Sequence, residues 1–311
     1  MKKVGESFHP IIILGAARSG TTLLAETVLS NYSEIAYWNE PNFIWTYGNA
    51  YRKEDVFHAE DATSNVQKYI TGRFLEYMQQ HQGKRFMEKT PANVFRVPFI
   101  LSIFPDAQII HVIRDGRDVA LSASNEWTGK GGGALDSQKL RKLPLLTKII
   151  QTTKNELQFK LRVRDLTSFF DLFSLSGRYF RFIQRQLLHS NNLIWGPRFP
   201  GIHATKKTHS LLETCALQWK YSVTAARNAC AHLPKEQYIE LRYEDLINTP
   251  NQEIEQILGY LNLHYDAQII AELSSHISQE RTAQWKTGLS NKELQQIEDL
   301  VGDTLSLLDY V

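Results

Sequence analysis

A run of small and hydroxyl-bearing residues follows the first apolar segment of the chain. Residues 15–22 lie between a predicted strand at Ile11–Leu14 and a predicted helix at Thr21–Ser30. A glycine loop that enters a helix directs several backbone N–H groups to one point, and the helix dipole adds about half a positive charge there. The loop also offers a fixed charge on Arg18 and hydroxyl donors on Ser19, Thr21 and Thr22, and Gly20 leaves its backbone N–H open to a ligand. This spacing favours a loop that binds a phosphate or sulfate group, with a ligand-free glycine turn as the alternative.

The position of the positive charge separates this loop from that of nucleotide kinases and ATPases. Those enzymes carry Lys where Thr21 stands, so that its ammonium group reaches the β- and γ-phosphates. Here the cation, Arg18, comes three residues earlier. A P-loop kinase or ATPase, with Asp115 as its metal-binding carboxylate, therefore stays an alternative that the loop disfavours.

A second group of polar residues begins where another apolar run ends. Gln108–Ile113 predicts a buried strand, Arg114 follows it directly, and Ser122 comes two helical turns later. Ligands of open parallel sheets bind beyond the carboxyl ends of the strands. An arginine fork with a serine hydroxyl suits a phosphate monoester. The alternative is that Arg114 forms a surface ion pair with Asp115 or Asp118.

Together the two segments resemble the donor-binding motifs of sulfotransferases. Ile-Leu-Gly-x-x-Arg-Ser-Gly-Thr-Thr-Leu, residues 13–23, is similar to their 5′-phosphosulfate-binding loop, and residues 104–122 are similar to their 3′-phosphate-binding strand and helix. The closest resemblance is to the bacterial branch that looks like the tyrosylprotein and carbohydrate sulfotransferases, because the loop carries Arg where cytosolic aryl sulfotransferases carry Lys. The resemblance covers roughly residues 8–127 and 211–311, and is weak across 129–210.

The resemblance implies roles for four further residues: Glu40, Lys89, Tyr243 and Arg281. Glu40 would be the catalytic base, and Lys89 would contact the sulfate together with Arg18. Tyr243 would pack near adenine, and Arg281 would belong to a basic segment that closes over the donor. The ordinary alternatives are an exposed turn carboxylate, a surface charge, a core tyrosine and a solvated arginine, respectively.

The function implied by the resemblance is sulfuryl transfer. The donor would be 3′-phosphoadenosine 5′-phosphosulfate (PAPS), the product PAP, and the acceptor a hydroxyl group of a small molecule, glycan, lipid-linked compound or peptide. Because the transferred sulfate carries a single negative charge, protein cations can replace Mg²⁺, and we expect no metal. A non-catalytic nucleotide-binding protein is a further alternative, which the joint presence of Glu40, Lys89, Arg114 and Ser122 disfavours.

The elements that must position these residues alternate between strand and helix. This alternation predicts an α/β fold with a P-loop-type parallel sheet flanked by helices. The further expected elements are helices at Pro98–Ile103 and from about Asp118, a strand at Tyr238–Arg242, and helices capped by Thr249 with Gln252 and by Ser290 with Glu293. The apolar stripe that contains Trp219 predicts a core helix. We expect one domain, with an α/β core at 8–127 and 211–311.

Residues 128–210 have a different composition and predict a helical insertion on the acceptor side. From Lys130 to Lys207 there are fifteen Lys or Arg residues against four acidic ones, next to a phenylalanine-rich apolar stripe. Such a segment can contact an anionic membrane or receive an acidic polysaccharide. The alternative is that the stripe packs on the core and the charges face solvent.

The overall composition is that of a soluble globular protein. The net charge of +2 gives no reason to expect a nucleic-acid partner. A membrane span requires about 18 consecutive apolar residues, and no apolar run of that length is present. The apolar run near the N-terminus is also too short for the core of a signal peptide. Cys215 and Cys230 would lie about 22 Å apart on one helix at ~1.5 Å per residue. We therefore expect free thiols and a cytoplasmic protein. Residues 129–210 are the segment through which it could contact a membrane. The histidines show no metal-binding spacing.

Overall fold

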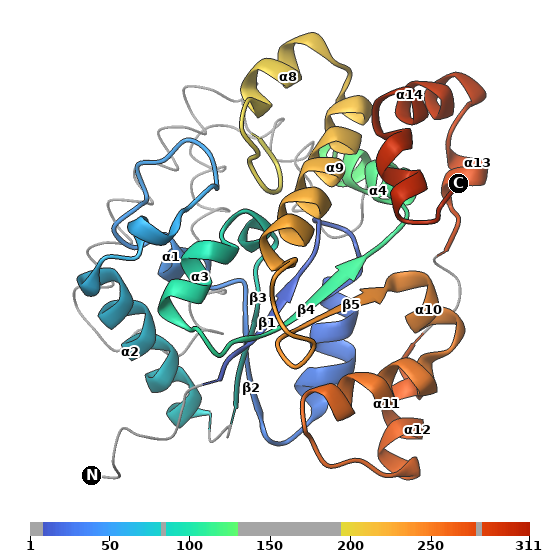
Figure 1. The fold of residues 1–311 in the computed structure, drawn as a ribbon. Helices are drawn as coiled ribbons and strands as arrows, with labels where there is room; N and C mark the ends of the chain where they lie inside the picture. The colour runs from blue at the N-terminus through green and yellow to red at the C-terminus, as the bar shows by residue number, and fades with distance from the viewer. Residues whose placement is uncertain (1–8, 82–84, 130–193, 278–281) are drawn as a thin grey trace, which may run out of the picture. The chain divides into compact units, whose positions relative to one another are not determined.

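A five-stranded parallel sheet forms the centre of the computed structural model, which describes residues 9–81, 85–129, 194–277 and 282–311 (Figure 1). The strand order is β2-β3-β1-β4-β5, and every neighbouring pair is parallel. The strands are β1 Ile11–Leu14, β2 Ile35–Asn39, β3 Arg85–Lys89, β4 Gln108–Ile113 and β5 Tyr238–Arg242. The predicted P-loop-type α/β fold is confirmed.

Helices cover both faces of this sheet, which explains why its central strand β1 is apolar throughout. Every residue of β1 is buried, because alternate side chains of a strand point to opposite faces and both faces are packed. One face packs against η1 Leu23–Val28, η2 Leu29–Asn31, α10 Tyr243–Asn248, α11 Pro250–Tyr260 and α12 Ala267–Ser275.

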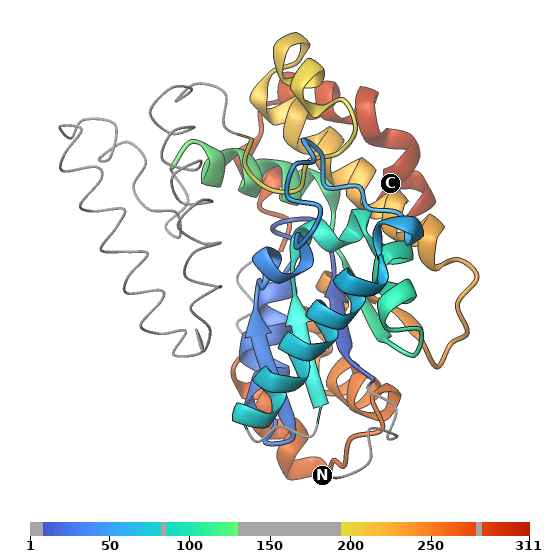
Figure 2. The same cartoon turned by 90° about the vertical axis from the view of Figure 1, so that its left-hand side faces the viewer.

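The opposite face carries an aromatic cluster. Its covering helices are α2 Ser64–Gln80, α3 Val97–Ile103 and α9 Leu211–Cys230. The rings that meet there belong to Trp38, Trp45, Phe74, Phe86, Phe99 and Phe104. Trp219 of α9 is fully buried, so its predicted place in the core is confirmed. The C-terminal helix α14 Asn291–Leu307 packs beside α9 (Figure 2).

Short helices complete the elements near the ends of the strands. They are α1 Asn42–Trp45, η3 Ala59–Asp61, η4 Pro91–Phe95, α8 Ile202–Thr208 and α13 Trp285–Gly288. The helix expected from about Asp118 is α4 Gly116–Trp127, which begins two residues earlier. Cys215 and Cys230 are both buried and free.

One of the two predicted capping boxes is present. At the start of α14, the Glu293 N–H donates to Ser290 Oγ at 3.3 Å, and the Ser290 N–H donates to Glu293 Oε2 at 2.9 Å. The box predicted for Thr249 is wrong. Helix α11 does begin at Pro250, but the Thr249 hydroxyl donates backward to the Asp245 carbonyl at 3.1 Å and caps no N–H group. The preceding helix α10 therefore captures the side chain on which the prediction depended.

The chain separates into two compact units, residues 1–124 with 196–311 and residues 125–195. The larger unit thus resumes at residue 196, before the boundary at 211 expected from the sequence. Residues 130–193, which hold most of the predicted insertion 128–210 and its basic stripe, lie outside the described residues. None of the helices in the described ranges is long and apolar enough to cross a membrane.

Candidate functional site

The loop after β1 has a backbone that requires glycine at both ends. A Cβ atom on Gly15 would lie 2.8 Å from the Val112 carbonyl oxygen of β4, and one on Gly20 would lie 2.2 Å from the Tyr243 ring. Gly20 has φ +95°, and Arg18 is left-handed at φ 76°. A left-handed backbone at a residue other than glycine is uncommon and costs free energy. The contacts around the loop therefore impose its shape.

The loop ends in an irregular helix that turns its first N–H groups toward the loop. The predicted helix is present, but residues 23–28 form a π-helical segment, a geometry found mostly at functional sites. The first N–H groups of a helix have no partner within it. Ser19 Oγ is also buried and has no hydrogen-bond partner in the described part of the chain. These donors fit an anionic oxygen bound in the loop.

The two predicted donor-binding motifs meet at Arg18. Its Nε donates to Ser122 Oγ at 3.1 Å, across 104 positions of sequence. Arg114 Nη1 donates to the Arg18 carbonyl oxygen at 3.3 Å. The side chain of Arg18 is exposed, and Ser122 is half-buried. The loop after β1 and the strand end of β4 therefore form one continuous polar surface.

Arg114 is held from several sides. Its Nη2 lies 3.2 Å from Asp118 Oδ2, and the two side chains are 8% and 1% exposed. The ion pair considered from sequence thus exists with Asp118, but it is buried rather than on the surface. The guanidinium also lies 4.4 Å from the centre of the Tyr243 ring, and the Trp219 indole N–H donates to the Arg114 carbonyl at 3.0 Å. These contacts orient the guanidinium at the carboxyl end of β4.

Tyr243, the first residue of α10, packs against the 15–22 loop. Its side chain is 3% exposed, with Gly20 against one part of the ring and Arg114 against another. Tyr243 is therefore buried, as the alternative of a core tyrosine predicts. Its ring contacts two residues of the predicted site. Arg281 lies outside the described residues.

Glu40 and Lys89 form an ion pair at the ends of β2 and β3. Lys89 Nζ lies 2.6 Å from Glu40 Oε1, and the Glu40 N–H donates to the Lys89 carbonyl at 3.1 Å. The Lys89 side chain is 4% exposed, so the surface-charge alternative is wrong, whereas the Glu40 side chain is 50% exposed. Glu40 is left-handed at φ 48°. A buried cation thus faces an accessible carboxylate.

Glu88, which the sequence reasoning missed, is a fully buried carboxyl beside this pair. Thr90 Oγ1 donates to Glu88 Oε2 at 2.7 Å, and Asn93 Nδ2 donates to Oε1 at 2.8 Å. Burial raises the pKa of Glu88 to about 7, although these hydrogen bonds lower it. The only sequence signal was a Glu directly before Lys89, which is not specific.

The acidic residue that a kinase would need is already engaged. Asp115 forms a bidentate pair with Arg117, with Arg117 Nη2 2.8 Å from Oδ2 and Nε 3.0 Å from Oδ1. Arg117 in turn stacks on Trp285 at 4.0 Å and donates to the Tyr310 carbonyl at 2.8 Å, which attaches the C-terminal segment to the start of α4. Asp115 thus has a structural partner. In the described ranges, no three His, Cys, Asp or Glu side chains gather as a metal site.

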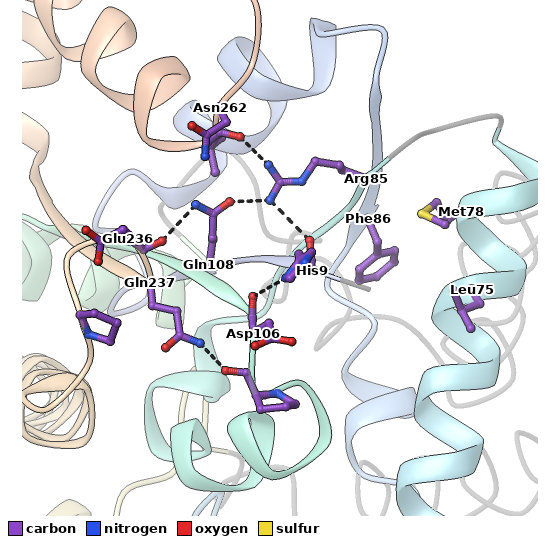
Figure 3. A pocket seen from close by; sticks show the side chains of 13 residues that line it. His9, Leu75, Met78, Arg85, Phe86, Asp106, Gln108, Glu236, Gln237 and Asn262 are labelled. Atoms are coloured by element: carbon purple, nitrogen blue, oxygen red, sulfur yellow. Dashed lines mark hydrogen bonds between the residues drawn. The ribbon is translucent and has the colours of Figure 1, made fainter. Parts of the chain in front are cut away.

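A cavity of about 820 Å³ lies at the opposite, amino-terminal edge of the sheet (Figure 3). Its polar lining groups bond to one another: Arg85 Nη2 donates to Gln108 Oε1 at 2.6 Å, and Gln108 Nε2 donates to the Glu236 carbonyl at 3.1 Å. Those predicted site residues that the structure describes lie at the other edge. We therefore assign the candidate site to the carboxyl edge.

Comparisons with known proteins identify the family and the fold of the chain. A model of the sulfotransferase family matches residues 10–170 and 194–267. The sulfotransferase domain from the curacin biosynthetic pathway has the same fold, with a TM-score of 0.51, 13% identity, and coverage of 95% of this chain and 98% of that one. A sulfotransferase of Mycobacterium avium gives a TM-score of 0.51 and 14% identity, with coverage of 97% and 77%.

A curated relative adds no function of its own. It is an uncharacterised protein of Aquifex aeolicus strain VF5, 30% identical over 130 residues. The match covers 37% of this chain and 17% of that protein, so the chain corresponds to a small part of this relative.

Proposed function

Because the chain belongs to the sulfotransferase family, we propose that it transfers a sulfuryl group from PAPS to a hydroxyl group of an acceptor. One observation carries this proposal: each of the five adjacent strands ends at a different predicted site residue. In sheet order these are Glu40 after β2, Lys89 at the end of β3, the 15–22 loop after β1, Arg114 after β4 and Tyr243 after β5. The carboxyl edge of a parallel sheet is where ligands of such folds bind.

Donor binding is divided between the two joined motifs. The 15–22 loop would hold the 5′-phosphosulfate through its backbone N–H groups, Ser19, and the hydroxyls of Thr21 and Thr22. Arg114 and Ser122 would hold the 3′-phosphate, the group that distinguishes PAPS from ATP. The hydrogen bond from Arg18 to Ser122 supports a single donor that spans both motifs.

The transfer step would use Glu40, Lys89 and Arg18. The acceptor oxygen forms a bond to sulfur, the bond from sulfur to the bridging oxygen of the donor breaks, and PAP leaves with the electron pair. Glu40 takes the hydroxyl proton, a role supported by its accessible carboxylate. Lys89 and Arg18 stabilise negative charge on the sulfuryl oxygens and on the leaving phosphate, because fixed charges need no reorganisation during the reaction.

The alternatives receive less support from the site. A kinase would need Asp115 for a metal ion, and Arg117 occupies that carboxylate. A non-catalytic binding protein would have no need for a buried lysine paired with an exposed, left-handed glutamate. The two buried free cysteines support a cytoplasmic location. We further propose that 128–210 borders the acceptor, which is a small molecule, glycan or lipid-linked compound.

The test is a transfer assay with radiolabelled PAPS. The acceptor panel comprises p-nitrophenol, a glucosamine oligosaccharide, a short-chain glycolipid and an acidic tyrosine peptide. We expect label on at least one acceptor, with PAP formed in equal amount. A parallel assay supplies ATP with Mg²⁺ in place of PAPS. Transfer from ATP alone, or PAP binding no tighter than AMP binding by calorimetry, would refute the proposal.

A further inference from the structure

The turn that carries Glu40 is conformationally strained. Glu40 is left-handed, and the Asn42 N–H donates to the Glu40 carbonyl at 2.7 Å across Pro41. A glutamate has no side-chain feature that favours this region, so the conformation persists only where its surroundings hold it. Lys89 holds the carboxylate and the N–H of Glu40 from the β3 side. A second support is needed on the side of α1.

That support is Arg96, which lies between η4 and α3 and is fully buried. Its Nη1 donates to Asn42 Oδ1 at 2.7 Å, which attaches the guanidinium to the residue two positions after Glu40. Its Nη2 lies 2.8 Å from Asp55 Oδ1, its Nε donates to the Asp55 carbonyl at 3.2 Å, and its plane lies 4.5 Å from the Phe57 ring. The guanidinium is therefore fixed in position and orientation.

Asp55 is itself fixed by a second arginine. Arg198 Nη2 lies 2.7 Å from Asp55 Oδ1, and the Arg198 N–H donates to Oδ2 at 2.8 Å. Two guanidinium groups thus share one buried carboxylate, and the segment from residue 196 is attached to the same point. Buried charges that are fully hydrogen-bonded resist displacement, because moving either one exposes the other without compensation.

Asn93 links this cluster to the other side of the Glu40 turn. Its Oδ1 accepts from Arg96 Nη1 at 3.3 Å, and its Nδ2 donates to Glu88 Oε1 at 2.8 Å. Glu88 directly precedes Lys89 in β3. One continuous hydrogen-bonded chain therefore runs from the strand that carries Lys89 to the turn that carries Glu40.

We propose that Arg96 is a positioning residue for sulfuryl transfer, which acts through Asn42 to hold the Glu40 turn against Lys89. The inference rests on the proposed function for its catalytic consequence. Its structural part, the stabilisation of the left-handed turn, does not depend on which acceptor is used. Arg96 contacts neither the loop nor Glu40 directly, so its effect is expected in the chemical step rather than in donor binding.

Asn42 offers a cleaner test than Arg96, because removal of Arg96 would leave Asp55 partly unpaired in the interior. Asn42 is exposed, so Asn42→Ala deletes the acceptor of the Arg96 bond with little effect on packing. Asn42→Asp keeps an oxygen in the same place. Arg198→Gln is the matched control, since it weakens the same Asp55 cluster without touching Asn42.

Two measurements are made on all three variants. Amide hydrogen exchange is followed in peptides that cover residues 38–46, and turnover is measured with the acceptor of highest wild-type rate in the panel above. For Asn42→Ala we expect faster exchange in that peptide and a kcat lower by about 10- to 100-fold, the scale of a misplaced catalytic group. PAP affinity and KM should stay within about twofold. Asn42→Asp should restore both readouts, and Arg198→Gln should lower Tm while kcat stays near that of wild type.

The outcomes separate the two proposals. If wild type transfers label to no acceptor, the proposed function fails, and the exchange data alone decide whether Arg96 holds the turn. If wild type is active but Asn42→Ala exchanges and turns over like wild type, the positioning role is overturned. The same holds if exchange accelerates without a fall in kcat, or if Arg198→Gln loses as much kcat as Asn42→Ala.

Discussion

The buried carboxyl of Glu88 predicts a pH dependence of stability that can be measured without any substrate. In the folded protein its side chain has no exposure to solvent, and the neutral side chains of Thr90 and Asn93 donate hydrogen bonds to it. Burial raises its pKa from the ordinary value of 4.5 to about 7. The folded state therefore binds a proton more tightly at Glu88 than the unfolded chain does.

The sign and size of the effect follow from this difference. Between pH 4.5 and about 7, the folded protein holds more protons than the unfolded chain, so the free energy of unfolding falls as pH rises. Ionisation of the buried Glu88 carboxyl costs no stability below the pKa that Glu88 has in the unfolded chain. The full cost applies above the pKa that it has in the folded protein. At 1.36 kcal/mol per pH unit, this interval corresponds to about 3 kcal/mol.

The substitution that tests this is Glu88→Gln, which keeps the shape and the acceptor for Asn93 but cannot ionise. Urea unfolding followed by circular dichroism, from about pH 4.5 to about pH 8, gives the free energy of unfolding at each pH. The difference between variant and wild type should rise by about 3 kcal/mol across this range. Glu60→Gln, which removes an exposed carboxylate, controls for the change in net charge. Parallel curves for Glu88→Gln and wild type would refute the reasoning.

Four further predictions concern the site. Glu40→Gln should lower kcat by about 10²- to 10⁴-fold, the usual contribution of a general base, while calorimetry finds PAP affinity near that of wild type. Arg114→Ala should weaken PAP binding by about 1.5–3 kcal/mol, and a loss confined to kcat would show that its role is misassigned. Gly20→Ala should lower stability by about 1–3 kcal/mol in thermal melts and abolish the stabilisation by PAP, because its Cβ would overlap the buried Tyr243 ring. EDTA should leave turnover intact, because Arg18 and Lys89 supply positive charge at the transferred group; complete loss that Mg²⁺ restores would contradict this.

Local patterns explain which elements could be predicted from the sequence. The strands β1, β4 and β5 have the predicted bounds, because each is a short run with clear boundaries whose structure depends mainly on burial. Strand β3 was missed, since Arg85, Glu88 and Lys89 interrupt its apolar pattern. A carboxyl can occupy this central strand only because Thr90 and Asn93 fold back onto it, and nothing in the local pattern shows that they do.

The same distinction applies to the site. The 15–22 loop and the segment from Arg114 to Ser122 are local motifs, so their residues could be found from spacing. The ion pair of Glu40 with Lys89 joins residues 49 positions apart, and Arg198 reaches Asp55 across 143 positions. The first pair forms because parallel strands bring distant ends to one edge, and the second because the segment from residue 196 packs against the loop that carries Asp55. Spacing in the sequence carries no record of either. The resemblance supplied roles for Glu40 and Lys89 but no partner for either.

Two residues assigned to chemistry, Arg18 and Glu40, have strained backbones. Arg18 and Glu40 are left-handed although neither is glycine, and each follows a different strand. Each is also held by contacts from a neighbouring strand end: Arg114 bonds the Arg18 carbonyl, and Lys89 bonds both ends of Glu40. At Glu40 we propose that the contact of Arg96 with Asn42 offsets the cost of this geometry without touching a ligand. Substitutions that break the Arg96 contact with Asn42 are therefore expected to lower kcat and stability rather than PAP affinity.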